Sequence, residues 1–361
     1  LITLYVLSIC APIIFNSKAI MVKYNDDYYF PLFNSIFSNK NIEAKDLGQF
    51  EIKGKKKYGQ PHYRLLKKQY QKEDKGNWVI MPLYPYDPYE EVISEKDEQF
   101  TDVNGNGVWD PSENFIDENG NGIADKYKYT NFPNSQHLLG TDNQGRDVLS
   151  RLIYGFNISI TFAIVCCFLS YIIGIIIGGT LGYFGGKVDL FGLRIIEIYG
   201  SIPFLFMLMI LATFIKPNVY ILASMYVFLT GWIGITWYVR GEFLREKSKD
   251  YVSAAVSMGQ SHWNVMFRHI LPNSLTPVIT FAPFAIIGYI SALVSLDYLG
   301  FGLQPPTPSW GELMAQGRTN LQYWHLIVSP LFSIGATLFL ITFIGEAIRE
   351  AFDPKVHSRL R

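Results

Sequence analysis

Residues 158–183 read ISITFAIVCCFLSYIIGIIIGGTLGY, a run without a charged side chain. A helix needs about 20 apolar residues to cross the hydrocarbon core of a bilayer, and a buried helix of a soluble protein rarely stays this apolar for so long. Gly174, Gly178 and Gly182 recur every four residues, which puts them on one helix face and permits a second helix to approach closely. The stretch therefore predicts a transmembrane helix packed against a neighbour.

Further apolar stretches follow at 198–215, 219–239, 275–296 and 326–344, each near the length that a bilayer demands. Residues 1–15 are also apolar but are shorter than a span and have no basic start. We interpret them as the end of a first transmembrane helix; a cleaved signal peptide is the alternative. The sequence thus predicts an all-α polytopic membrane protein with about six transmembrane helices.

Composition separates this membrane part from a polar part. Charged residues make up 17% of the chain, below the roughly 25% that is usual for soluble domains. The formal net charge is zero, so no basic excess is present to neutralise the phosphates of a nucleic acid. Four parts are expected: residues 1–15 as a partial first helix, 16–138 as a polar insert, 139–345 as the membrane domain and 346–361 as a tail.

Basic residues indicate the orientation in the membrane. The segment 240–274 carries Arg240, Arg245, Lys247, Lys249 and Arg268, and the tail is basic as well. By the positive-inside rule both are expected in the cytoplasm, and counting spans backwards places the insert on the outside of the membrane. Long loops such as the insert are exempt from the rule.

The segment 250–273 carries the clearest functional signal. Ala254 and Ala255 are small enough to let a short helix lie close to a partner, and Gly259 permits a sharp turn at low steric cost. A second helix is expected over 261–270, with Pro272 directly before the next span. Such a bent element between two spans is suited to docking into the groove of another protein; an ordinary amphipathic linker is the alternative.

The chain lacks an ATP-binding loop. The nearest sequence is Gly185-Gly186-Lys187, but Leu181 and Val188 occupy the positions that need Gly and Ser or Thr. ATP hydrolysis would have to come from another chain, so we expect a protein that is not itself an enzyme and binds no nucleotide.

The segment 250–273 resembles the EAA loop of ABC import permeases, on the string Ala254-Ala255, Gly259 and Ile270-Leu271-Pro272. The resemblance implies the type I ABC importer permease fold, with this loop inserted into a cleft of an ATPase subunit. Ser253 stands where the family has Glu, which leaves open an acidic contact to the ATPase. The resemblance assigns ATPase coupling to Tyr251, Ser253, Ala254, Ala255, Gly259, Arg268, His269 and Pro272.

Three other segments resemble the dipeptide and oligopeptide branch of this family. Residues 139–147 resemble the signature LGTDxxGRD, 295–311 resemble the outer end of the fifth span, and the terminus resembles GDxxRxxxDP, with Glu346 in the Asp position. Without the family, the cluster at 140–147 would be interpreted as a capped turn with a salt bridge. The signature residues are Gly140, Asp142, Gly145, Arg146, Asp147, Arg349, Asp353 and Pro354.

The start of the insert, with Lys23-Tyr24 and Tyr28-Tyr29-Phe30-Pro31, resembles Yej-type permeases, which are associated with microcin C and peptide uptake. The family implies import of peptides or peptide-like solutes across the bacterial inner membrane by alternating access, with the insert on the periplasmic side. It also implies a second permease subunit in a heterodimer, two ABC ATPase subunits and a periplasmic solute-binding protein as partners.

Residues 102–113 of the insert fit the EF-hand calcium pattern D-x-[DN]-x-[DN]-G-x₅-E. Oxygen ligands in this number suit Ca²⁺ better than Zn²⁺; Asn-Gly hairpin turns are the alternative. A second copy begins at Asp117 but has Lys128 in place of the last Glu, and tandem loops as in dockerin are as plausible as a paired EF-hand. The candidate ligands are Asp102, Asn104, Asn106, Val108, Asp110 and Glu113, then Asp117, Asn119, Asn121, Ile123 and Asp125.

The sequence therefore favours a permease with an irregular, β-poor insert that carries structural calcium loops. A calcium-responsive membrane receptor or scaffold is the alternative, which would explain the calcium loops but not the element at 250–273.

Overall fold

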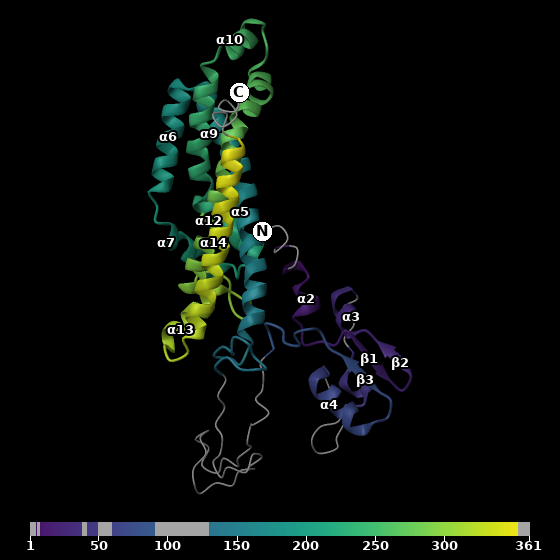
Figure 1. Ribbon diagram of the computed structural model, residues 1–361. Coiled ribbons are helices and arrows are strands. Elements are labelled where there is room, and N and C mark those ends of the chain that lie inside the picture. Colours follow the sequence, from purple (N-terminus) through teal and green to yellow (C-terminus); the bar gives the residue numbers. More distant parts are fainter. Residues whose placement is uncertain (1–4, 6–7, 38–41, 50–59, 91–129, 353–361) are drawn as a thin grey trace. The chain divides into compact units, whose positions relative to one another are not determined.

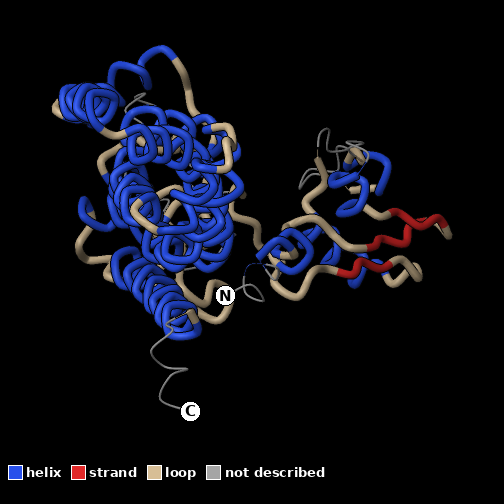
Figure 2. Tube along the Cα trace, turned by 90° about the horizontal axis from the view of Figure 1, so that it is seen from above, coloured by secondary structure: helices blue, strands red, loops and turns tan. Residues whose placement is uncertain are grey.

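The computed structural model describes residues 5, 8–37, 42–49, 60–90 and 130–352, and the chain forms two units. The helical unit comprises Leu1–Tyr5, Gly155–Ala315 and Pro330–Arg361, and the insert unit comprises Val6–Tyr154 and Gln316–Ser329. Figure 2 distinguishes the helices from the strands.

The helical unit is built on four long apolar segments. Three of them are α5 (Val148–Phe184), α12 (Leu271–Tyr298) and α14 (His325–Ala351). The fourth is α8 (Val219–Tyr226), which continues through the π-helical turn η2 (Val227–Gly231) into α9 (Trp232–Lys247). Figure 1 shows α5, α9, α12 and α14 side by side along their length. Within the described residues these four are long and apolar enough to cross a membrane, with Val278–Tyr298 as the apolar part of α12.

A fifth span is formed only if α6 (Gly186–Gly200) and α7 (Phe204–Phe214) are taken together, since they are bent by 67°. The break contains Pro203, whose ring fixes its own φ and disfavours helix in the residue before it. The sequence predicted a span over 198–215, and the break between α6 and α7 lies inside that stretch, at 201–203. Of the expected first span, the described residues contain α2 (Ala11–Ile14).

The glycine face of α5 packs against α9, as its spacing predicted. A Cβ atom on Gly178 would lie 2.5 Å from the carbonyl oxygen of Thr236, and one on Gly182 would lie 2.7 Å from that of Arg240. Only glycine therefore permits this backbone separation. Asp189 of α6 and Arg240 of α9 form a bidentate ion pair, in which two guanidinium nitrogens each lie 2.5 Å from one carboxylate oxygen.

The end of the bundle that carries the 250–273 segment has its own apolar core. Tyr183 of α5, Val239 and Phe243 of α9 and Val278 of α12 enclose buried residues of the 250–273 segment. That segment comprises α10 (Asp250–Ser257), α11 (His262–Asn264) and a π-helical turn, η3 (Val265–Ile270). Helix α13 (Trp310–Thr319) follows α12 along the chain.

The insert unit contains a small antiparallel sheet in the order β2-β1-β3. Its strands are β1 (Met21–Tyr24), β2 (Asp27–Tyr29) and β3 (Trp78–Ile80), and Val22 pairs with Tyr29 on one side and Val79 on the other. Asn25 and Asp26, both with positive φ, make the hairpin turn. Such a pair matches the right-handed twist of the strands.

Helices cover this sheet: α3 (Pro31–Phe37), η1 (Ala44–Leu47) and α4 (Tyr63–Glu73). Val22, Leu66 and Tyr70 form the centre of the insert core, and the Tyr70 hydroxyl donates to the carbonyl of Leu47 at 2.6 Å. The expectation of an irregular insert needs correction here, since these residues bury a core of their own. The predicted calcium ligands, 102–125, lie outside the described residues.

Candidate functional site

The 250–273 segment forms the predicted helix–turn–helix. Helix α10 ends at Ser257, and Gly259 adopts a φ of +76°. The Ser261 side chain then caps α11 by accepting from the backbone N–H of Asn264 at 3.3 Å. A left-handed residue after a helix is the usual role of glycine, so the local sequence determines this bend.

One of the two alanines is buried and the other is not. Ala255 lies in the apolar core with Val252 of the same helix and Ile270 of η3, whereas Ala254 and Ser253 are exposed. The close helix contact expected of both alanines is therefore made within this chain by Ala255. Ala254 and Ser253 remain on the surface of the loop.

Three large apolar side chains project at the end of this loop. Val256, Met258 and Trp263 are 50%, 72% and 69% exposed; we call them the tip surface. The Trp263 ring rests on Phe267, with ring centroids 4.1 Å apart. A group of exposed apolar side chains on a well-packed element is typical of a protein-binding surface.

A chain of hydrogen bonds fastens α10 to its neighbours. The Tyr251 hydroxyl donates to Oε2 of Glu246 in α9 at 2.9 Å, and Lys249 contacts the other oxygen at 2.8 Å. The amide of Asn273 in α12 donates to the Tyr251 hydroxyl at 3.3 Å and to the carbonyl of His269 at 2.8 Å. Burial raises the pKa of Tyr251 above its ordinary value, which keeps the hydroxyl protonated.

Further contacts hold the turn and the second helix. The Tyr183 hydroxyl lies 2.7 Å from Nδ1 of His262, and His269 Nε2 lies 3.2 Å from Oε1 of Gln260. Arg268 is exposed, and Pro272 occupies the first turn of α12, where a missing N–H is tolerated. The predicted coupling residues thus lie on α10, the turn at Gly259, η3 and the start of α12, and Glu246 was missed because it lies before the motif.

The signature at 139–147 builds a buried ion-pair network in the insert unit. Asp142 accepts from the backbone N–H groups of Gln144 and Arg146 at 2.9 Å, and its other oxygen lies 2.7 Å from the Arg146 guanidinium. Arg151 approaches the same oxygen at 3.5 Å. Gly140 and Gly145 both have a φ of +75° and make the turns.

Asp147 then begins α5. It accepts from the backbone N–H of Ser150 at 2.8 Å, which is the usual contact of a helix N-cap, and from the Tyr84 hydroxyl at 2.8 Å. Nδ1 of His137 lies 2.8 Å from the same carboxylate. The interpretation as a capped turn with a salt bridge is therefore confirmed as the local structure of these residues.

At the other signatures, Asp297 is buried and accepts from the backbone N–H of Leu303 at 2.7 Å and from the Ser309 hydroxyl at 2.5 Å. Arg349 pairs with Glu346 at 3.1 Å on the exposed face of α14. Asp353 and Pro354 lie outside the described residues.

Metal binding was predicted only in the insert, at Asp102 to Glu113 and Asp117 to Asp125, which the structure does not describe. Across the ranges that it does describe, no group of three or more His, Cys, Asp or Glu side chains is placed to hold a metal ion. Cys10, Cys166 and Cys167 are free thiols.

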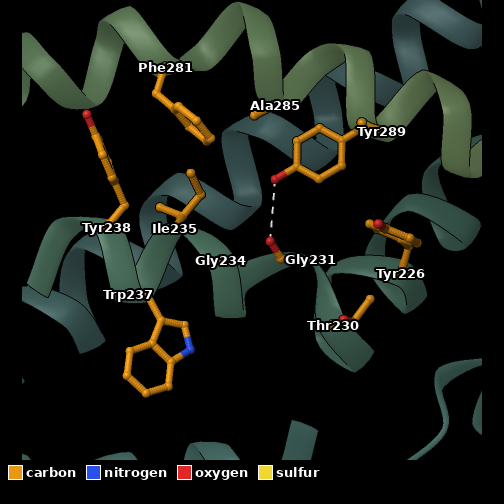
Figure 3. A pocket seen from close by; sticks show the side chains of 11 residues that line it. Tyr226, Thr230, Gly231, Gly234, Ile235, Trp237, Tyr238, Phe281, Ala285 and Tyr289 are labelled. Atoms are coloured by element: carbon orange, nitrogen blue, oxygen red, sulfur yellow. Dashed lines mark hydrogen bonds between the residues drawn. The ribbon is translucent and has the colours of Figure 1, made fainter.

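An open groove of about 590 Å³ is lined by residues of α8, η2, α9 and α12 (Figure 3). Tyr226 and Tyr289 pair at one end and Tyr238 and Phe281 at the other, with ring centroids 5.9 and 5.1 Å apart. Thr230, Ile235 and Trp237 also line it, and the residues between the aromatic pairs are small: Gly231, Gly234, Ala285 and Gly288.

Comparison with known proteins supports the resemblance to ABC import permeases. Residues 170–358 match the family described as "Binding-protein-dependent transport system inner membrane component". The chain is 35% identical over 351 residues to the "Inner membrane ABC transporter permease protein YejE" of Escherichia coli (strain K12), covering 97% of this chain and 90% of that protein.

Other similar proteins match a shorter part of the chain. The "Peptidoglycan transport system permease protein YejE" of Agrobacterium fabrum is 46% identical over 217 residues, which are 60% of this chain and 57% of that protein. The "Oligopeptide transport system permease protein OppC" of Haemophilus influenzae is 37% identical over 221 residues, 61% of this chain and 70% of the relative. A structure of the MetNI methionine ABC transporter aligns with 57% of this chain and 97% of its own at 18% identity and a TM-score of 0.45.

Proposed function

We propose that this chain imports peptides or peptide-like solutes by alternating access, because it belongs to the binding-protein-dependent transport inner membrane component family. It is a multi-pass inner-membrane permease of the ABC importers, which include peptide permeases. Energy would come from ATP hydrolysed by separate subunits. The named relatives act in oligopeptide and peptidoglycan transport systems, so a peptide is the chemical group that both kinds of cargo share.

The tip surface is the proposed contact with the ATPase. The observation that carries this proposal is a bent element that exposes Val256, Met258 and Trp263 while Tyr251 fastens it to α9 and α12. Exposed apolar side chains bind a groove, and a rigid attachment passes a displacement of the loop to the helices. A permease without a nucleotide site of its own requires both properties.

The other partners follow from the same proposal. We expect a second permease subunit in a heterodimer, two ABC ATPase subunits and a periplasmic solute-binding protein that delivers the cargo. The basic residues near the loop support a cytoplasmic position for the tip surface and a periplasmic one for the insert. The family assignment accounts for the 250–273 element, which the alternative of a calcium-responsive receptor does not.

We also propose that residues 102–113, and more weakly 117–128, bind Ca²⁺. The support is the complete ligand spacing from Asp102 to Glu113 in the sequence. A loop rich in glycine and asparagine gains order from such an ion, so its proposed role is structural.

Co-purification tests the ATPase contact. M258E and W263E should each release the ATPase subunits from the permease complex in mild detergent, because a buried unpaired charge would replace an apolar contact. S257A, at an exposed position of the same helix to which no coupling role is assigned, is the matched control and should retain them. Equal recovery of the ATPase with all three variants would refute the proposed contact.

A further inference from the structure

Helix α6 runs along α9 at the depth of a membrane span (Figure 1). Near its start Asp189 pairs with Arg240 of α9, and near its end the Tyr199 hydroxyl donates to the carbonyl of Phe228 at 2.7 Å. Between these two contacts the chain of η2 and α9 contains no charged residue. The middle of α6 therefore lies level with an uncharged part of the span Val219–Lys247.

One side of α6 faces away from the rest of the bundle. Ile196 is the buried residue of this helix, and Phe191, Arg194 and Ile198 lie opposite to it, since residues three, four and seven positions apart share a helix face. Phe191 and Ile198 are 65% and 70% exposed, and the Arg194 side chain is 71% exposed. We call these three residues the α6 stripe. The described part of the chain leaves this stripe largely uncovered.

An ion pair on the α6 stripe excludes lipid as its covering. Nη1 of Arg194 lies 2.7 Å from Oε2 of Glu197, whose side chain is 45% exposed. Glu197 lies one turn farther from the start of α6, which the proposed orientation places at the cytoplasm. The guanidinium therefore points into the bilayer and does not reach back to the headgroups, as a snorkelling Arg would. Charged side chains at such a depth face protein or a water-filled cavity.

Large apolar side chains around the ion pair exclude water as its covering. Phe191 and Ile198 lie on either side of Arg194 along the stripe, and Ile195 beside them is 68% exposed. Side chains of this size are unfavourable against water and favourable against protein. An Arg among large apolar side chains is typical of the buried centre of a protein–protein interface.

Helix α14 shows by contrast what a lipid-facing surface of this chain contains. Its side chains Phe332, Phe339 and Phe343 are 75%, 62% and 59% exposed, and no charged residue occurs between Leu326 and Gly345. Such a surface suits lipid tails. Exposed apolar area alone therefore does not distinguish α6 from α14, whereas the ion pair within that area does.

From these observations we propose that the α6 stripe, with the ion pair of Arg194 and Glu197, binds the second permease subunit within the membrane. That subunit would cover Phe191 and Ile198 and present a polar or charged side chain to the ion pair, because a buried pair needs further hydrogen bonds to offset its desolvation. This requirement makes the contact selective for a partner with the matching group. The inference rests on the proposed function, which supplies the second permease subunit as a partner.

Photo-cross-linking tests which molecule covers the stripe. The three native cysteines of the chain are replaced, and I198C in the assembled complex is labelled with benzophenone maleimide and illuminated. We expect a covalent product with the second permease subunit. F339C is the matched control, because Phe339 is an apolar side chain of similar exposure on α14, and it should yield adducts with lipid only.

The outcomes separate the inference from the proposed function. Adducts of I198C with lipid alone, in a complex that contains the second permease subunit, would overturn the inference and leave the proposed function standing. A product within the same chain would overturn it as well, because another part of this chain would then cover the stripe. Wild-type chain that co-purifies with no second permease subunit would instead refute the proposed heterodimer, and the inference with it.

A larger side chain gives a second readout. I198W should lower the recovery of the second permease subunit roughly tenfold, as expected when a closed interface is overpacked. F339W should retain the subunit, because a Trp that faces lipid meets no packed surface. Recovery is measured per amount of chain in the membrane, so poor insertion of a variant does not count as release. Equal recovery with both variants would overturn the inference.

Discussion

The hydroxyl of Tyr251 donates a 2.9 Å hydrogen bond to the Glu246 carboxylate, and this contact joins the start of α10 to the end of α9. Glu246 is only 2% exposed, so the bond is shielded from water. With Asn273 donating to the same hydroxyl, one tyrosine connects the 250–273 segment to the helices on both sides of it. A displacement of the tip surface would be transmitted to the helical bundle through this residue.

Removal of the hydroxyl should therefore uncouple the loop. Y251F keeps the ring but leaves one oxygen of buried Glu246 without this donor, at a cost of about 1–3 kcal/mol. We expect ATPase subunits to co-purify normally while less peptide is transported per ATP hydrolysed in proteoliposomes. S257A serves as the control, and an unchanged peptide-to-ATP ratio in Y251F would contradict a transmitting role.

The conformation of Gly259 permits a test that separates backbone from volume. Its φ is +76° and no described atom lies within 4 Å of an added Cβ, so a side chain fits but a strained backbone results. Asn tolerates this region and a β-branched residue does not. G259V should abolish peptide-dependent growth with the protein still in the membrane, whereas G259N should retain most of it. Equal growth of both strains would show that the bend is not needed.

Close packing of α5 on α9 predicts a stability effect at Gly178. G178A places a methyl group 2.5 Å from the Thr236 carbonyl oxygen, and overpacking of this kind costs about 1–3 kcal/mol. Thermal unfolding of the purified chain in detergent should show a lower midpoint. G335A, where the methyl group meets open space, should leave the midpoint unchanged or raise it; a drop of the same size there would refute the packing argument.

A substitution in the buried Asp142 network should destabilise the chain far more than a substitution in an exposed ion pair. D142N removes the carboxylate beside buried Arg146 and Arg151, and an uncompensated buried charge costs about 3–5 kcal/mol. E346Q breaks the exposed pair with Arg349, for which about 0–1 kcal/mol is expected. The thermal midpoints of the two variants in detergent measure the difference, and equal midpoints would contradict the network's structural role.

Calcium binding by the insert is testable in the full chain. With a dissociation constant of about 10⁻³ M, about 10 mM Ca²⁺ should stabilise the folded insert by about 1.4 kcal/mol. Isothermal calorimetry and thermal unfolding should both detect the ion in wild type, and D102A combined with E113A should abolish both signals. The same calcium response in the double variant would disprove the ligand assignment.

Much of the helical unit could be predicted from the sequence because its signals are local. An apolar run defines each long helix, the Gly174–Gly178–Gly182 spacing defines a packing face, and Gly259 defines the bend. The start of α5 was missed because residues 148–157 mix polar and apolar side chains, and the α6–α7 break, which contains Pro203, interrupts an otherwise apolar stretch.

The insert and the fastening contacts were harder to predict, for physical reasons. Strands of three or four residues are too short to establish an alternating pattern, although the Asn25-Asp26 turn is a recognisable hairpin signal. Glu246 pairs with Tyr251 only because α9 continues to Lys247 and brings the carboxylate back over α10. Such tertiary contacts have no signature in sequence spacing.

Cross-linking from the tip surface tests the central claim most directly. A photoreactive maleimide attached to M258C in the assembled complex, with the native cysteines replaced, should form a covalent product with an ATPase subunit upon illumination, and the same reagent on G335C should not. A complex that transports peptide but in which position 258 cross-links only to lipid, or to the periplasmic binding protein, would contradict the account.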